Sequence, residues 1–110
     1  MTVAVLADKL NLKPISVCDE EREVGGVYAG DLLSWVMGRA KTDNAWITIM
    51  SNINVIAVAT LVDTACVILA EGVTLDDAAI SAAKAKDINI ISTELTAYDA
   101  AIKLSDLLSA

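Results

Sequence analysis

Residues 46–72 read WITIMSNINVIAVATLVDTACVILAEG. This stretch contains two short, almost wholly apolar runs at residues 46–50 and 65–69, each followed by a polar loop. A helix-like segment at residues 55–62 lies between them. Short apolar runs bounded by polar loops are typical of strands that are covered on both faces in a parallel sheet. The stretch therefore predicts two strands joined by a crossover helix.

The same pattern continues toward the C-terminus. A third apolar run occupies residues 88–91, and helix-like segments follow the second and third runs at residues 76–86 and 97–108. The strand starts recur about every 20 residues, which is the length of a compact strand-loop-helix unit. We therefore expect an α/β fold, a small layered sandwich with a mostly parallel sheet flanked by helices through right-handed crossovers.

The N-terminal half begins with a short helix over residues 2–10, for which Thr2 is the predicted N-cap. Residues 15–18 and 24–28 are rich in β-forming side chains, and the acidic residues 19–21 between them suggest a turn. We expect these two segments to be strands that pair with each other.

A glycine-rich stretch follows the second of these strands. Ala29-Gly30-Asp31 predicts a turn into a helix that ends near Gly38, with Asp31 as N-cap. Gly25, Gly26 and Gly30 have the wrong spacing for a dinucleotide-binding loop, so we interpret them as structural turn or close-packing positions. The predicted inner face of the helix consists of Leu32, Leu33, Val36 and Met37.

Length and composition favour a single domain over residues 1–110. Apolar residues make up 55% of the chain, and the mean hydropathy is +0.57. A domain of this size cannot hide so many aliphatic side chains behind its own surface, so we expect a homodimer formed through an apolar helix face or a strand edge.

The formal charge of −7 disfavours nucleic acid and anionic membranes as partners, because both require clustered Lys and Arg. The longest apolar stretch, residues 55–70, contains Asp63 and does not qualify as a membrane span. Residues 1–10 lack the basic head and apolar core of a signal peptide. The sequence predicts a cytoplasmic protein.

The sequence contains little that supports a catalytic function. The chain has no histidine, which excludes serine triads and histidine-containing zinc sites. Ser34 and Ser51 are interpreted as capping or surface hydroxyls, and residues 19–21 as solvated acids. Cys18 and Cys66 are predicted to be buried, reduced thiols. We therefore predict no catalytic residue, no metal site and no cofactor.

A ligand site is predicted where the loops after the parallel strands meet, at the carboxyl edge of the sheet. The candidate residues are Ser51, Asn52, Asn54, Glu71, Gly72 and Thr93, with Glu94 beside them. The alternative is that Asn54, Thr74 and Thr96 simply cap helices. Trp35 and Trp46 either stack on a base or fill a core or interface.

The order of these features resembles the DRTGG domain family, which occurs alone or attached to CBS domains, pyrophosphatases and phosphotransacetylases. The resemblance covers nearly the whole chain. It depends on the segment REVGGVYAGDL at residues 22–32, on ITI at 47–49 with its loop, on VILAEG at 67–72 and on INIIST at 88–93. The last segment is also similar to the N-terminal domain of HPr kinase/phosphorylase, but the chain has no G-x-x-x-x-G-K-[ST] phosphate-binding loop.

The resemblance implies a regulatory or ligand-sensing module, and the CBS association implies adenine nucleotides. The family's Asp-Arg pair falls on Asn52 and Ile53, and its Thr-Gly-Gly on Ala70-Glu71-Gly72. Loss of the Arg removes a bidentate grip on an anion, and Glu71 repels one. Three hypotheses stay open: a non-catalytic regulatory module sensing a small metabolite, an adenine-nucleotide sensor, and an interaction subunit of a metabolic or redox complex.

Overall fold

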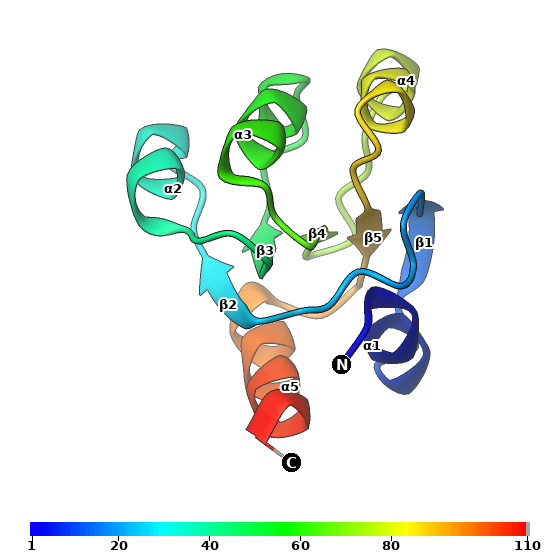
Figure 1. Ribbon diagram of the computed structural model, residues 1–110, viewed down its shortest axis with the longest axis vertical. Helices are drawn as coiled ribbons and strands as arrows, with labels where there is room; N and C mark the ends of the chain where they lie inside the picture. The colour runs from blue at the N-terminus through cyan, green and yellow to red at the C-terminus, as the bar shows by residue number, and fades with distance from the viewer. Residues whose placement is uncertain (110) are drawn as a thin grey trace.

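Residues 1–109 are described by a computed structural model in which helices and strands alternate along most of the chain (Figure 1). The helices are α1 (Val3–Lys9), α2 (Leu33–Arg39), α3 (Asn54–Val62), α4 (Asp77–Ala85) and α5 (Ala97–Ser109). The strands are β1 (Lys13–Ser16), β2 (Gly26–Ala29), β3 (Asn44–Thr48), β4 (Cys66–Leu69) and β5 (Ile90–Ser92). Every helix and strand predicted from the sequence is present, and the observed ends lie within a few residues of the predicted ones.

Within residues 1–109 the strands form one sheet in the order β1-β5-β4-β3-β2. Strands β2 to β5 run parallel, and β1 pairs antiparallel with β5. The prediction of a mostly parallel α/β sheet is confirmed. The predicted pairing of residues 15–18 with 24–28 is wrong, because the acidic segment between them crosses the amino ends of the strands and places β1 and β2 at opposite edges (Figure 1).

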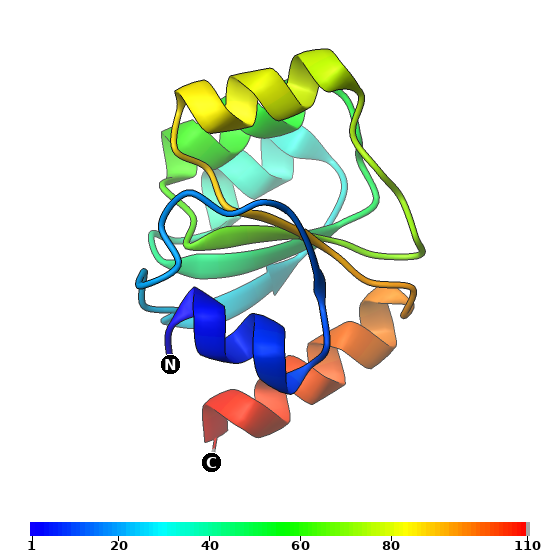
Figure 2. The same cartoon turned by 90° about the vertical axis from the view of Figure 1, so that its right-hand side faces the viewer.

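Helices cover both faces of the sheet, giving three layers (Figure 2). Helices α2, α3 and α4 lie on one face, and α1 and α5 on the other. Successive strand residues alternate between the two cores: Trp46 and Val67 pack in the cluster with α2 to α4, whereas Ile47 and Ile68 pack in the cluster with α1 and α5. Strand β4 is buried throughout. The apolar runs are therefore continuous because both faces of these strands are covered.

Three helix starts show how polar side chains replace missing backbone partners. The Thr2 hydroxyl accepts from the Val5 N–H at 3.2 Å, and the Thr96 hydroxyl accepts from the Asp99 N–H at 3.1 Å, so both predicted caps are confirmed. At α4 the cap is Asp76 rather than Thr74. Asp76 competes better because its carboxylate accepts a charge-assisted bond and favours the positive end of the helix dipole.

Asp31 does not cap α2, which corrects the prediction. The residue before the helix is Leu32, whose side chain cannot accept a hydrogen bond. The Asp31 carboxylate instead accepts from the Thr48 hydroxyl at 2.8 Å and from the Ile49 N–H at 3.0 Å. It therefore ties the loop after β2 to the end of β3. Of the predicted inner face, Leu33 and Val36 pack in the core, whereas Leu32 and Met37 are exposed.

The two tryptophans have different surroundings. Trp46 is fully buried, and its indole N–H donates to the Gly30 carbonyl at 2.9 Å. Trp35 is 52% exposed, with the Arg39 guanidinium 3.7 Å from its ring centroid. A cation over an indole face is a favourable surface contact. Trp46 is thus a core residue, and Trp35 belongs to the surface of α2.

The two cysteines also differ. Cys66 is buried in β4, as predicted, whereas Cys18 is exposed. The prediction for Cys18 is wrong because it lies just beyond β1, in the segment that crosses the sheet edge, and not within a covered strand. Burial raises the pKa of the Cys66 thiol to about 12, with a smaller opposing effect from Arg22.

Part of the apolar surplus lies at the surface. The exposed large apolar residues in or next to α2 and α3 include Leu32, Trp35, Met37, Ile53 and Leu61. Within residues 1–109, no helix is both long and apolar enough to cross a membrane. Part of the surplus is therefore exposed in or next to short helices.

Candidate functional site

The loops that follow the parallel strands meet at one edge of the sheet and then separate. The loop after β4 leads to α4, whereas the loop after β5 leads to α5 on the opposite face (Figures 1 and 2). In open α/β sheets, a ligand crevice forms where neighbouring loops leave the sheet on opposite faces. In this protein that point lies between the carboxyl ends of β4 and β5.

The two loops are fastened to each other at this point. The Glu71 N–H donates to the Leu95 carbonyl at 2.8 Å, and the Gly72 N–H donates to the Thr93 carbonyl at 2.9 Å. Glu71, Gly72 and Thr93 are therefore brought together, as predicted for neighbouring strand ends. Their backbone N–H groups are used by the protein, so they cannot bind an anion without breaking these bonds.

Gly72 is also the position that the Glu94 side chain covers. Its φ is +70°, and a Cβ atom there would lie 2.5 Å from Glu94 Oε2. The left-handed backbone and the close carboxylate both favour glycine. At the end of β4, the place where a crevice is expected, the Glu94 carboxylate therefore lies against Gly72.

The other predicted residues belong to the loop after β3. Asn52 Oδ1 accepts from the Asn54 N–H at 2.9 Å, which forms a local turn at the start of α3. Both asparagines are exposed, and Ser51 is half-buried. Asn54 is the first residue of α3 rather than its cap. This part of the predicted site shapes a helix start and contributes surface hydroxyl and amide groups.

The glycines near β2 make close structural contacts. The Gly25 N–H donates to the Asp43 carbonyl at 2.9 Å, and the Gly30 N–H to the Ile47 carbonyl at 3.1 Å. A Cβ atom at Gly30 would lie 3.0 Å from the Tyr28 ring, and one at Gly26 would lie 3.1 Å from the Asn44 amide nitrogen. These contacts agree with close-packing roles.

A cavity of about 390 Å³ opens beside the loop after β5, between the end of α1 and the side of α5. Of the predicted site residues, Thr93 lines it. The lining residues are Leu10, Asn11, Lys13, Ser92, Thr93, Glu94, Leu95 and Lys103. We call this space the corner cavity. Its volume falls within the range of about 300–1,000 Å³ that is usual for small-molecule sites.

The corner cavity contains two positive charges in an acidic protein. Within residues 1–109 the ion pairs are made by the N-terminal ammonium and by Arg22, so Lys13 and Lys103 keep their ammonium groups available in that part of the chain. Glu94 adds one negative charge, and Ser92 and Thr93 add hydroxyls. This combination suits an anion that also carries a donor for a carboxylate.

Sequence reasoning missed most of these residues. Lys13 lies in β1, Lys103 in the second turn of α5, and Asn11 after α1, so the fold brings together residues that are more than 90 positions apart in the sequence. No spacing motif signals such a set. The available signals were Thr93 and Glu94, which were both named in the predicted loop after β5 and both line the cavity.

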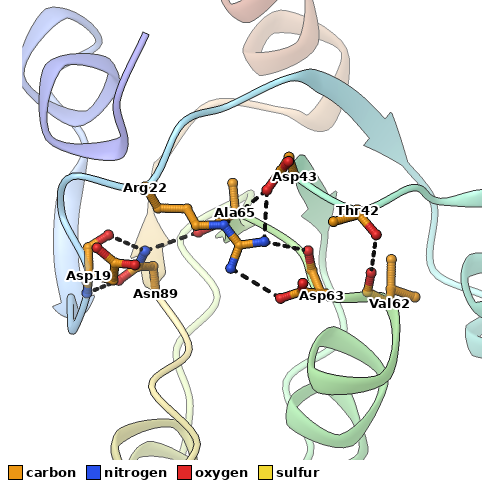
Figure 3. A network of polar contacts seen from close by, with 8 residues as sticks. All are labelled: Asp19, Arg22, Thr42, Asp43, Val62, Asp63, Ala65 and Asn89. Carbon is orange, nitrogen blue, oxygen red and sulfur yellow. Dashed lines mark hydrogen bonds and ion pairs between the residues drawn. The ribbon is translucent and has the colours of Figure 1, made fainter.

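A polar network lies at the other end of the strands, where β3, β4 and β5 begin, and its contacts are structural (Figure 3). Asn89 is 3% exposed. Its Oδ1 accepts from the Cys18 and Asp19 N–H groups, both at 2.9 Å. Its Nδ2 donates to the Asp19 carbonyl at 2.8 Å and to the Ala65 carbonyl at 3.0 Å. The amide therefore satisfies its full bonding capacity while it holds the crossing segment.

Arg22 completes this network (Figure 3). Its guanidinium donates to Asp43 Oδ1 at 2.8 Å and to the Asp63 carbonyl at 2.8 Å, and it lies 3.1 Å from Asp63 Oδ1. Burial by itself lowers the pKa of Arg22, but the hydrogen bonds to Asp43 and Asp63 outweigh it and the pKa is raised. The guanidinium of Arg22 is already bound by Asp43 and Asp63 of the same chain, so it is not free to bind an anionic ligand.

Comparison with known proteins adds one similarity of fold. No model of a known protein family matches the sequence, and no curated protein matches it. Among solved structures, the chain is similar to the crystal structure of the CBS and DRTGG domains of the regulatory region of Clostridium perfringens pyrophosphatase, which is complexed with the activator diadenosine tetraphosphate. The TM-score is 0.77 at 16% identity, over 92% of this chain and 44% of that chain. The similarity is consistent with a DRTGG-like fold, and this chain spans less than half of the matched one.

Proposed function

We propose that this protein is a non-catalytic regulatory module that binds a small anionic metabolite in the corner cavity. The observation that carries the proposal is the pair Lys13 and Lys103, which line one cavity together with hydroxyl groups and Glu94. The similarity of fold to a regulatory region supports a regulatory role. The ligand class is a phosphate or carboxylate that also carries a hydroxyl or amine.

The position of the cavity supports coupling between ligand binding and the loop at the carboxyl end of β4. Glu94 lines the cavity and also lies against Gly72 at the end of β4. A ligand donor that draws the Glu94 carboxylate into the cavity changes its contact with Gly72. Glu94 would then couple ligand binding in the corner cavity to the conformation at Gly72, because the same side chain contacts both.

Calorimetric titration tests the proposal. The probes are inorganic phosphate, AMP, ADP, ATP and a small amino acid, and the variants are Lys13→Gln and Lys103→Gln. Each variant removes one positive charge, so we expect the affinity of the bound probe to fall by about tenfold, equivalent to about 1.4 kcal/mol. Lys84→Gln on α4 is the matched control and leaves affinity unchanged. Absence of binding at millimolar probe, or equal binding by all variants, contradicts the proposal.

Adenine nucleotides are the second candidate, favoured by the activator bound to the matched regulatory region. In the corner cavity, the phosphates would face Lys13 and Lys103, and the base would contact Leu10 and Leu95. A cavity of about 390 Å³ suits a mononucleotide better than a dinucleotide. Selective binding of AMP over phosphate in the same titrations supports this reading, and equal affinity for both rejects it.

The non-catalytic part of the proposal has its own test. Incubation with ATP or p-nitrophenyl phosphate is expected to release no product above the buffer rate. A reproducible rate that disappears in Asn52→Ala or Glu71→Gln, but persists in Asn54→Ala, contradicts it.

A further inference from the structure

A second cavity lies between α3 and α4, which are neighbours on one face of the sheet (Figures 1 and 2). It is a groove of about 420 Å³, and this volume falls within the range of about 300–1,000 Å³ that is usual for small-molecule sites. The corner cavity is lined from α1 and α5, which cover the other face. The two cavities are therefore separate and can be tested separately.

The α3 side of the groove is one apolar stripe of the helix. Its members share the spacing of a single helical face, and they are Ile53, Ile56, Ala57, Thr60 and Leu61. Leu61 is 69% exposed and Ile53 is 51% exposed, so an apolar occupant would remove apolar surface from water. The Thr60 hydroxyl donates to the Ile56 carbonyl at 2.8 Å and needs no polar partner from that occupant.

The α4 side contributes a small side chain and a positive charge. Ala82 and Lys86 are one helical turn apart and both line the groove. Both helices run from the carboxyl ends of the strands back toward the amino ends, so Lys86 lies at the same end of the groove as Leu61. An ammonium group therefore marks one end of an otherwise uncharged groove.

The ammonium of Lys86 is available to an anion. The ion pairs within residues 1–109 are made by the N-terminal ammonium and by Arg22. Asp63 follows α3 at this end, but its carboxylate lies 3.1 Å from the Arg22 guanidinium. Neither Asp63 nor Asp87 lines the groove. The charge of Lys86 is thus complementary to an acidic group on a bound molecule.

We propose that the groove between α3 and α4 binds a medium-chain alkyl carboxylate, with the alkyl chain on the α3 stripe and the carboxylate at Lys86. Helix α3 rises about 12 Å from Ile53 to Leu61, at about 1.5 Å per residue, and this span suits an alkyl chain of medium length. Ala57 and Ala82 leave room for the chain because their side chains are small. The site does not depend on ligand binding in the corner cavity.

Calorimetric titration with decanoate tests the site. We expect saturable binding of one decanoate per chain, and Ala57→Leu, which fills the groove, should lower the affinity by at least about tenfold. Ala78→Leu, at an exposed position of α4 outside the groove, is the matched control and should bind decanoate like the wild type. Binding that does not saturate, or equal binding by wild type and Ala57→Leu, overturns the proposal.

A series of chain lengths tests the apolar contact. Each methylene added between hexanoate and decanoate should raise the affinity by up to about fourfold, equivalent to about 0.8 kcal/mol. The gain should stop once the chain is longer than the groove. Equal affinity for hexanoate and decanoate overturns the proposal.

Decanol tests the role of charge. Lys86→Gln should weaken decanoate binding by about fivefold, equivalent to about 1 kcal/mol, the upper value for an exposed ion pair. Its affinity for decanol should be unchanged. Lys84→Gln, on α4 but outside the groove, is the control and should bind both compounds like the wild type. A Lys86→Gln variant that binds decanoate as tightly as the wild type overturns the proposed position of the carboxylate.

Two other occupants of the groove give different results. A second copy of the chain in the groove would form a dimer that decanoate dissociates in sedimentation velocity, whereas we expect the same association state with and without decanoate. A membrane surface would bring the protein down with phosphatidylglycerol vesicles, whereas we expect it to stay in solution. Either a dimer dissociated by decanoate or vesicle binding that Ala57→Leu abolishes overturns the proposal.

Discussion

Replacing Asn89 with alanine should destabilise the fold more than any exposed asparagine does. The side chain makes four hydrogen bonds, to the Cys18 and Asp19 N–H groups and to the Asp19 and Ala65 carbonyls. Each is worth about 1 kcal/mol net, and water reaching the crossing segment compensates part of the loss. We therefore expect a loss of about 3 kcal/mol, a large share of the roughly 5–15 kcal/mol of a typical domain.

Thermal and urea unfolding followed by circular dichroism measure this loss. For a domain of about this size, 1 kcal/mol corresponds to about 4–8 °C in Tm, so the melting temperature should fall by about 12–24 °C. Asn54→Ala is the control, because Asn54 is exposed, and it should change stability by less than about 0.5 kcal/mol. If Asn89→Ala matches that control, the amide does not hold the crossing segment and the reasoning is refuted.

Three further predictions concern the thiols and the crevice. A thiol reagent at pH 8 should modify Cys18 alone in the native protein and both cysteines in urea, because Cys66 is buried with a pKa of about 12; two fast native thiols would contradict this. Since burial raises the pKa of the Cys66 thiol above its ordinary value of 9.0, its contribution to stability is complete below pH 9 and is lost as pH rises toward 12. The stability difference between wild type and Cys66→Ala should therefore shrink over that range in urea titrations. Gly72→Ala should lower stability by about 1–2 kcal/mol through its positive φ and the nearby Glu94 carboxylate, and adding Glu94→Ala should recover part of the loss; no recovery would mean that the backbone alone is responsible.

The sequence predicted the covered parallel strands because their apolar runs reflect burial on both faces. Strand β4 reads CVIL and is buried at every position, and the helices that follow β3, β4 and β5 carry their own start signals. The pairing of β1 was not predictable in the same way. It pairs with β5 about 75 residues away, and that choice depends on side chains such as Asn89 that fasten the crossing segment.

The sequence predicted where the candidate site lies, but not most of the residues that line it. Glu71, Gly72 and Thr93 come together because parallel strand ends share one edge. Lys13 and Lys103 could not be assigned, since their proximity requires β1 to lie beside β5 and α5 to cross the opposite face. The role of Asp31 was misjudged because a carboxylate before a helix can either cap it or, as here, bind the next strand end.

Binding of an anion in the corner cavity is tested most directly by nitrogen-15 NMR titration with AMP and with inorganic phosphate. We predict saturable shifts of the Thr93, Glu94 and Leu95 amides at the cavity, with smaller shifts of Gly72 through the Glu94 contact. In Lys103→Gln the same shifts should need about tenfold more ligand to saturate. Absence of shifts at millimolar ligand, or shifts confined to amides outside the corner cavity, would contradict the account.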